Sequence, residues 1–227
     1  MKIIQIAIDG PAASGKTTVA RGVASRLEVL YLDTGAMYRA LAYLALHTRT
    51  DADNGAALAR LETQQPIRVV PDRKLGLGFR VFAGSAELSE NTLQSNEVTA
   101  IVSTVAAHKE VRELMVRAQR EAADAASVVM AGRDIGTVVL PDAGVKIFLT
   151  ASVSARVARR KAQLEAAGVD VDVHRLTEEI EERDRLDRTR AVSPLAPAPG
   201  AHVIDSSEMS ADAVVDEICS IVAGVRG

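Results

Sequence analysis

The apolar positions of the chain follow two periods that alternate along its length. Short, largely β-branched apolar runs lie at 3–8, 29–32, 128–131, 145–149 and 202–205, and their length and composition are typical of buried strands. The segments between several of these runs repeat their apolar residues at helical spacing. Because strands alternate with helices, we expect an α/β fold with a parallel sheet of about five strands and helices on both faces.

The middle of the chain carries elements that interrupt this alternation. The pattern predicts helices at about 36–46, 91–107 and 110–126, weak helical character at 51–61 and a small antiparallel patch at 66–89. A charged helical region at about 152–190 follows the fourth core strand. We therefore expect a single domain over 1–227, whose core combines about 1–35, 127–155 and 191–227.

The first strand leads directly into a phosphate-binding motif. The pattern G-x-x-x-x-G-K-[ST] fits residues 10–17, between a strand and an apolar helix, which is the context that the motif requires. Its glycines let successive backbone N–H groups point at anionic oxygens, Lys16 adds a cation at the β/γ-phosphates, and the Thr17 hydroxyl can ligate Mg²⁺. We therefore expect a nucleoside triphosphate to bind Gly10, Pro11, Ala12, Ala13, Ser14, Gly15, Lys16, Thr17 and Thr18.

Composition narrows the classes of partner. The chain is 48% hydrophobic and 25% charged, as in soluble globular proteins, and it holds no apolar run of ~18 residues. The first apolar run is too short for a signal peptide. The single cysteine, Cys219, excludes an intrachain disulfide, and the net charge of −3 argues against a broad nucleic-acid surface. We expect a cytoplasmic protein that binds neither nucleic acid nor membranes.

Three further polar clusters have two interpretations each. In the order in which the clusters are named below, the ordinary interpretations are a capped helix, a local Arg–Asp pair in a turn, and a solvated, ion-paired helix. The functional one is a phosphate site at the carboxyl ends of the strands, closed by an arginine-bearing lid. The clusters are Thr34, Tyr38 and Arg39 after the second strand; Arg133 and Asp134 in a glycine-flanked turn after the third; and Arg183, Asp187 and Arg190 on one face of the charged helix.

Taken together, five segments resemble the bacterial cytidylate (CMP) kinases of the nucleoside monophosphate kinase superfamily. They are 8–12, 32–39, 132–143, 145–149 and 183–195, which lie in the family's order from one end of the chain to the other. The phosphate loop is generic, whereas 132–139 and 188–195 are specific. The resemblance implies a P-loop kinase fold with a nucleoside monophosphate (NMP) binding region at about 36–126, a β insertion near 63–105 and a lid at about 156–190.

The resemblance also implies an activity and a role for each matching residue. The activity is Mg²⁺-dependent transfer of the ATP γ-phosphoryl group to CMP or dCMP by a monomeric enzyme. Among the matching residues, Lys16, Arg133, Arg183 and Arg190 would be catalytic. Arg39, Arg133 and Arg190 would bind the acceptor phosphate; Ser103, Arg112 and Asp134 would read cytosine; Thr34, Arg183 and Asp187 would hold the sugar; Tyr38 would wall the pocket; and Arg156, Arg160 and Arg183 would cover the ATP phosphates.

The chain departs from the family pattern at two positions. Ala131 stands where the family usually has a carboxylate near the Mg²⁺ water shell, and Gln94 stands where it usually has an arginine. Asp9 is a candidate to replace the missing carboxylate. Two alternatives stay open: a related small-molecule kinase with another acceptor, such as UMP, dTMP or shikimate, and a non-catalytic nucleotide-binding regulator. A GTPase is disfavoured because the N-K-x-D motif is absent from the sequence.

Overall fold

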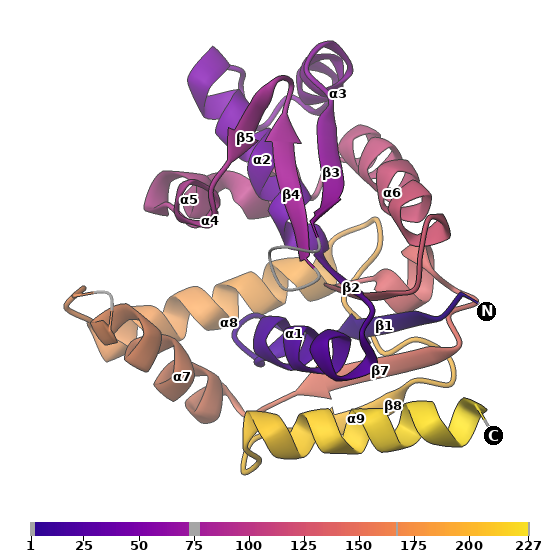
Figure 1. Ribbon diagram of the computed structural model, residues 1–227. Coiled ribbons are helices and arrows are strands. Elements are labelled where there is room, and N and C mark those ends of the chain that lie inside the picture. The colour runs from indigo at the N-terminus through magenta and orange to yellow at the C-terminus, as the bar shows by residue number, and fades with distance from the viewer. Residues whose placement is uncertain (1–2, 73–77, 167, 227) are drawn as a thin grey trace.

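A five-stranded parallel sheet forms the centre of the computed structural model, which describes residues 3–72, 78–166 and 168–226. Its strands are β1 (Gln5–Asp9), β2 (Leu30–Asp33), β6 (Val128–Gly132), β7 (Val145–Thr150) and β8 (His202–Asp205), in the order β2-β6-β1-β7-β8 (Figure 1). Asp9 is in register with Gly132 on one side and with Phe148 on the other. The carboxyl ends of the central strands therefore lie side by side, and the predicted parallel sheet is confirmed.

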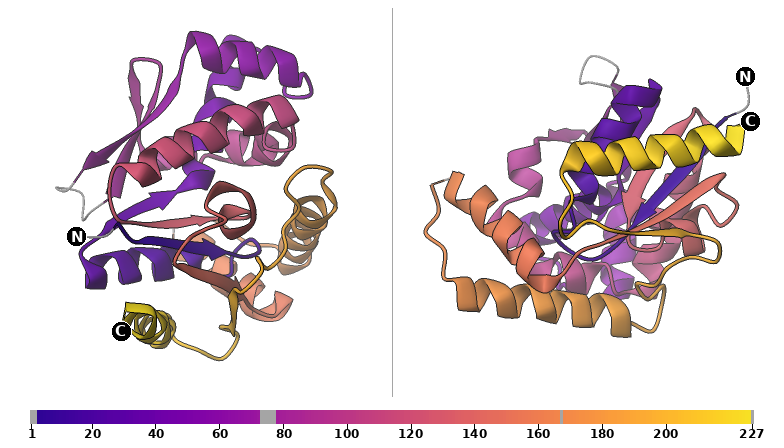
Figure 2. Two further views of the ribbon diagram at one scale, coloured as in Figure 1. Left: turned by 90° about the vertical axis from the view of Figure 1, so that its right-hand side faces the viewer. Right: turned by 90° about the horizontal axis from the view of Figure 1, so that it is seen from below.

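Helices cover both faces of this sheet because successive side chains of a strand point to opposite faces. Ile6 and Ile8 pack with α1 (Lys16–Leu27) and α9 (Ala211–Arg226), whereas Ala7 between them packs with α2 (Thr34–Thr48). Figure 2 shows α9 lying along one face of the sheet. In the described part of the chain, no helix is both long enough and apolar enough to cross a bilayer.

The segment between β2 and β6 forms a separate layer beside the sheet (Figure 1). It holds the helices α2, α3 (Gly55–Gln64), α4 (Glu90–Leu93), α5 (Asn96–Val105) and α6 (Lys109–Asp124), and the antiparallel strands β3 (Ile67–Asp72), β4 (Gly78–Ala83) and β5 (Ala86–Leu88). The antiparallel patch is confirmed, although residues 73–77 of the expected range lie outside the described residues. The insertion expected near 63–105 is β-structured only between Ile67 and Leu88, because α4 and α5 follow it.

The single helix expected at 91–107 is wrong. The chain forms α4 and α5 instead, because Ser95 stops one helix and begins the next. The Ser95 hydroxyl accepts a hydrogen bond from the Val98 N–H at 3.4 Å, which satisfies a free amide at the start of α5. The apolar spacing continues across this break, so hydrophobic periodicity alone does not reveal it.

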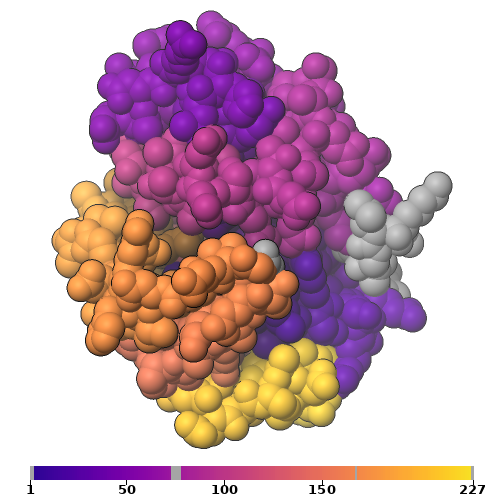
Figure 3. All heavy atoms as spheres, turned by 90° about the vertical axis from the view of Figure 1, so that its left-hand side faces the viewer, coloured from indigo at the N-terminus to yellow at the C-terminus, as the bar shows by residue number. Residues whose placement is uncertain are grey.

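The charged region at 152–190 folds as two helices, α7 (Val153–Ala166) and α8 (Val173–Thr189). Val157, Leu176 and Ile180 form a small apolar cluster between them. The Asp172 carboxylate caps α8 by accepting hydrogen bonds from the N–H groups of its first turn. Figure 3 shows this helical pair beside the N-terminal part of the chain and below the layer between β2 and β6.

Candidate active site

The phosphate loop connects β1 to α1 at the carboxyl end of the sheet. Gly10 is required by space, because a Cβ atom there would lie 2.0 Å from the Leu149 carbonyl oxygen, and Gly15 has a left-handed φ of 90°. Lys16 is buried, and its Nζ donates to the Pro11 carbonyl at 2.6 Å and to Ser14 Oγ at 3.3 Å. The lysine therefore folds back over a loop shaped to hold an anion.

The residues near the start of α1 fit a Mg²⁺ ion that is bound largely through nucleotide phosphates. The Thr17 hydroxyl lies half-buried in the first turn of α1. Within the described residues, no cluster of three or more acidic, histidine or cysteine side chains could hold a metal ion. Mg²⁺ commonly binds in proteins through one or two protein oxygens, substrate phosphates and water. Ala131 packs in the apolar cluster that also contains α1, so a carboxylate at this position would face the α1 side of the sheet.

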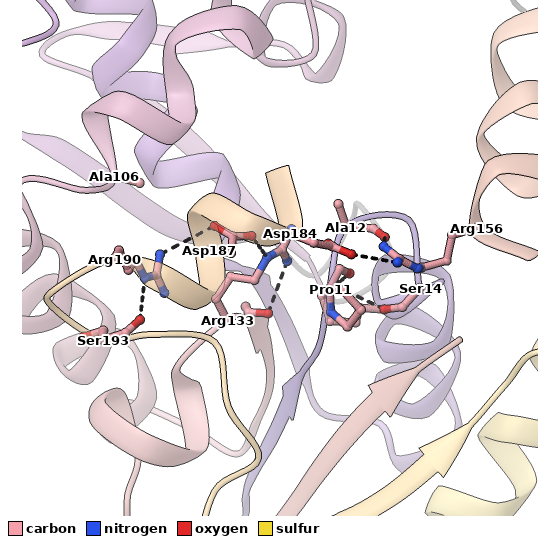
Figure 4. Close-up of polar contacts among 12 residues, drawn as sticks. Pro11, Ala12, Ser14, Ala106, Arg133, Arg156, Asp184, Asp187, Arg190 and Ser193 are labelled. Atoms are coloured by element: carbon pink, nitrogen blue, oxygen red, sulfur yellow. Dashed lines mark hydrogen bonds and ion pairs between the residues drawn. The ribbon is translucent and has the colours of Figure 1, made fainter. Parts of the chain in front are cut away.

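Four arginines converge beside the phosphate loop. Arg39 lies on α2, Arg133 follows β6, Arg183 lies on α8 and Arg190 ends that helix. Asp187 lies among them: its Oδ2 accepts from Arg133 Nε at 2.7 Å, and its Oδ1 is 3.8 Å from Arg190 Nη1. Figure 4 shows the Arg133 and Arg190 side chains directed toward Asp187. The predicted phosphate-binding arginines are thus brought together by the fold.

The electrostatics of this cluster favour a bound anion. Burial, with repulsion from Arg133 and Arg39, lowers the pKa of Arg183 to about 10. Burial and Arg133 likewise lower the pKa values of Lys16 and Arg39. Among the described residues, the buried Arg183 Nε and Arg190 Nη2 have no hydrogen-bond partner. A phosphate group would supply acceptors for these donors and offset the repulsion between the cations.

A buried ion pair lies next to this cluster. Arg112 Nη2 on α6 contacts Asp134 Oδ2, and the two side chains are only 3% and 6% exposed. The Arg112 guanidinium lies 5.4 Å from the centroid of the Tyr38 ring, and burial raises the pKa of that phenol to about 12. Because arginine only donates and a carboxylate only accepts, the pair can recognise a planar base that has a donor beside an acceptor.

Arg156, one of the expected lid arginines, is engaged within the protein. It is 3% exposed, its Nη1 donates to the Ala12 carbonyl at 3.1 Å, and its Nη2 is 2.7 Å from Asp184 Oδ2. Figure 4 shows Arg156 between Asp184 of α8 and Ala12 of the phosphate loop. In this arrangement Arg156 joins α7 to α8 and to the loop.

Arg159, which sequence reasoning missed, also contacts the phosphate loop. Its Nη1 donates to the Ser14 carbonyl at 3.3 Å and to Ser206 Oγ at 3.0 Å. The predicted Arg160 donates to Gln163 on its own helix at 3.4 Å, and its charge helps to lower the pKa values of Arg39 and Arg183. Consecutive helical residues point roughly 100° apart, so the two arginines face different surroundings. Arginine content alone could not tell them apart.

The remaining expected ligands differ in how far they are buried. Thr34 is buried, and its Oγ1 donates to the Ala131 carbonyl at 3.0 Å. Ser103 is half-buried on α5, and Thr18 is exposed on α1. Gln94 is exposed at the end of α4.

The glycine-flanked turn expected after β6 continues into a π-helix, η2 (Ile135–Val139), which sequence reasoning missed. Asp9 holds its first turn, because its two carboxylate oxygens accept from the N–H groups of Ile135 at 2.8 Å and Gly136 at 2.7 Å. The only signal in the sequence is a charged residue at the end of an apolar strand. Its partners are more than a hundred residues away, so local spacing could not identify them.

Known proteins resemble the chain over nearly its whole length. The cytidylate kinase family profile matches residues 6–224. A cytidylate kinase of Exiguobacterium sibiricum is 46% identical over 224 residues, which is 99% of each protein, and one of Bacillus cereus is 47% identical over 99% of this chain and 98% of its own. The crystal structure of an uncharacterized protein from Eubacterium ventriosum shares the fold, with a TM-score of 0.56, 13% identity and coverage of 98% of this chain and 99% of its own. The residues that the family profile matches include the sheet, the phosphate loop and the arginine cluster, and the chain belongs to the cytidylate kinase family.

Proposed function

We propose that the protein is a phosphotransferase that moves the γ-phosphoryl group of ATP to CMP or dCMP, giving ADP and CDP or dCDP. One observation carries the choice of acceptor: the buried Arg112–Asp134 pair lies beside the arginine cluster that includes Arg133 and Arg190. A nucleoside monophosphate has a base and a phosphate to match both parts. The phosphate loop on the other side of the cluster accommodates the triphosphate.

The acceptor is held at three points. The Arg112–Asp134 pair reads the cytosine edge, with Asp134 accepting from the exocyclic amine and Arg112 donating to the base. Asp187 accepts from a sugar hydroxyl; burial alone would raise the pKa of Asp187, but Arg133, Arg183 and Arg190 hold it below its usual range, so the group is an anionic acceptor. Arg39, Arg133 and Arg190 bind the acceptor phosphate.

The transfer step needs positioning and charge neutralisation rather than a protein base. An acceptor phosphate oxygen, already anionic, forms a bond to the γ-phosphorus while the bond from that phosphorus to the β–γ bridging oxygen breaks, and the electron pair leaves with ADP. Lys16, Arg133 and Arg183 neutralise the charge on the transferring group. Thr17 and the nucleotide phosphates would hold Mg²⁺, which would supply further charge neutralisation. We expect the enzyme to work as a cytoplasmic monomer.

A coupled ADP-release assay over a panel of monophosphates tests this function. CMP and dCMP should exceed UMP in kcat/KM by roughly 10-fold to 1000-fold, because the wrong base leaves buried polar groups unpaired. Equal efficiency with UMP, or a preference for AMP, would reject the cytosine assignment but keep the kinase. If none of the monophosphates is phosphorylated although ATP binds tightly, the result would favour a non-catalytic regulator.

The lid assignment has a matched control on the same helix. Arg183 is half-buried beside the cluster, whereas Arg175 on α8 is exposed and pairs with Glu179. Arg183→Gln should lower kcat by about 100-fold or more, because a cation at the transferring phosphoryl is lost. Arg175→Gln should leave kcat within about twofold of the parent, as a surface pair contributes little. Similar losses in both variants would show that the lid acts through its fold and not through Arg183.

A further inference from the structure

The π-helix η2 is held at both ends by side chains from different parts of the protein. At its start, the buried Asp9 carboxylate accepts the N–H groups of Ile135 and Gly136. At its end, Arg120 Nε donates to the Val139 carbonyl at 2.9 Å, and Arg120 Nη2 donates to the Val138 carbonyl at 2.7 Å. The wide turn itself closes with a bond from the Leu140 N–H to the Ile135 carbonyl. Such turns are rare and occur frequently at functional sites.

These contacts connect the two halves of the candidate active site. Asp9 is the last residue of β1 and immediately precedes Gly10, the first residue of the phosphate loop. The segment that Asp9 holds immediately follows Arg133 and Asp134, which serve the acceptor phosphate and base. One carboxylate therefore joins the donor loop to the acceptor turn.

Helix α6 holds the same turn from the other side. Arg112 binds the Asp134 side chain at the start of η2, and Arg120, eight residues further along α6, binds the carbonyl groups at its end. The acceptor turn is thus fixed between the sheet and the helix that carries Arg112. A displacement of η2 would move Asp134 relative to Arg112 and Arg133 relative to Asp187.

We propose that Asp9 is a positioning residue for acceptor binding, which holds the Arg133–Asp134 turn in place against the phosphate loop through the Ile135 and Gly136 amides, with Arg120 fixing the far end of η2. This rests on the proposed function. A carboxylate suits the task because it offers two acceptor oxygens to two N–H groups, whereas an asparagine would turn its NH₂ group toward one of them. Both oxygens already accept from the turn, and the Mg²⁺ dependence of the rate separates this role from that of a carboxylate that binds metal-bound water.

The test compares Asp9→Asn and Arg120→Gln with the control Arg117→Gln, an exposed arginine on the same helix. A misplaced contact can cost about 100-fold, so Asp9→Asn should raise KM for CMP by about 10-fold to 100-fold. It should lower the CMP-over-UMP ratio of kcat/KM as strongly, while KM for ATP changes by less than about threefold. Arg120→Gln, at an exposed position that should not affect folding, should raise KM for CMP and lower the CMP-over-UMP ratio of kcat/KM, each by about 3-fold to 10-fold. Arg117→Gln should match the parent.

Each alternative role gives a different result. A merely structural role would lower melting temperature and active fraction with both KM values and the CMP-over-UMP ratio unchanged. A metal role would change the Mg²⁺ concentration for half-maximal rate and leave that ratio intact. Either pattern overturns the proposal, as does an Arg120→Gln variant indistinguishable from Arg117→Gln. Failure of the proposed function would appear separately, as a parent enzyme without preference for CMP. If Asp9→Asn does not fold, the comparison of Arg120→Gln with Arg117→Gln decides.

Discussion

The buried pair between Arg112 and Asp134 should couple stability to base recognition. Its side chains are 3% and 6% exposed, so removing one partner leaves the other as an uncompensated buried charge, which costs about 3–5 kcal/mol. Asp134→Asn should therefore lower the free energy of unfolding by that amount, and so should Arg112→Met. This is a large part of the roughly 5–15 kcal/mol that stabilises a typical protein.

A double-mutant cycle isolates the interaction. Once either charge is gone, removing the other relieves the buried charge that remains, so the double variant should be no less stable than the worse single variant. The coupling free energy should then be about 3 kcal/mol or more. Because the chain has no tryptophan, urea unfolding is best followed by far-UV circular dichroism. The exposed pair of Arg185 and Glu182 on α8 serves as a control, and its coupling should be far smaller.

Two results would refute this reasoning. If the single effects add to within about 0.5 kcal/mol, the two groups do not interact energetically. If the single variants lose stability as expected but keep the parent preference for CMP over UMP, the pair stabilises the fold without reading the base.

Three further predictions concern the phosphate loop, the metal and pH. Lys16→Ala should lower kcat on the order of 10³-fold without lowering the melting temperature, because burial and repulsion from Arg133 disfavour this cation in the folded state; a variant with parent kcat would contradict the assignment. Ala131→Asp should lower the Mg²⁺ concentration for half-maximal rate by about 10-fold, as measured by titrating Mg²⁺ against the initial rate. If Asp9 served the metal instead, Asp9→Asn would change that concentration and Ala131→Asp would not. Burial outweighs the Gly136 and Ile135 amides and raises the pKa of Asp9 from 3.8 to about 6. The folded state therefore binds the Asp9 proton more tightly than the unfolded state does. The contribution of this proton to the free energy of unfolding is complete below about pH 4 and is lost as the pH rises to about 6, a change of roughly 3 kcal/mol. Urea unfolding of the parent and Asp9→Asn across this range should show that difference, and a pH-independent difference would refute it.

The local elements follow from the sequence because their causes are local. The apolar run ending in Asp9 and the glycines at 10 and 15 specify strand and loop through burial and backbone freedom. The periodicity of 19–27 specifies the helix whose start faces the phosphate loop. Spacing on α8 likewise places Arg183 and Asp187 on one face, whereas Arg190, expected on the same face, follows the helix as its C-cap in extended backbone. The break at Ser95 escapes this reasoning because a serine cap competes with a continuous apolar stripe.

The sequence by itself determined the kind of chemistry, because the phosphate loop and the arginine-bearing segments are contiguous motifs whose residue types suit phosphate. Only the tertiary structure decided which partners meet. Asp9 finds the η2 amides across more than a hundred residues, and Arg159 rather than Arg160 reaches the phosphate loop. Such pairings depend on strand register and on the rotation of one helix against another. Both are set by packing of the whole core, so no short stretch of sequence contains them.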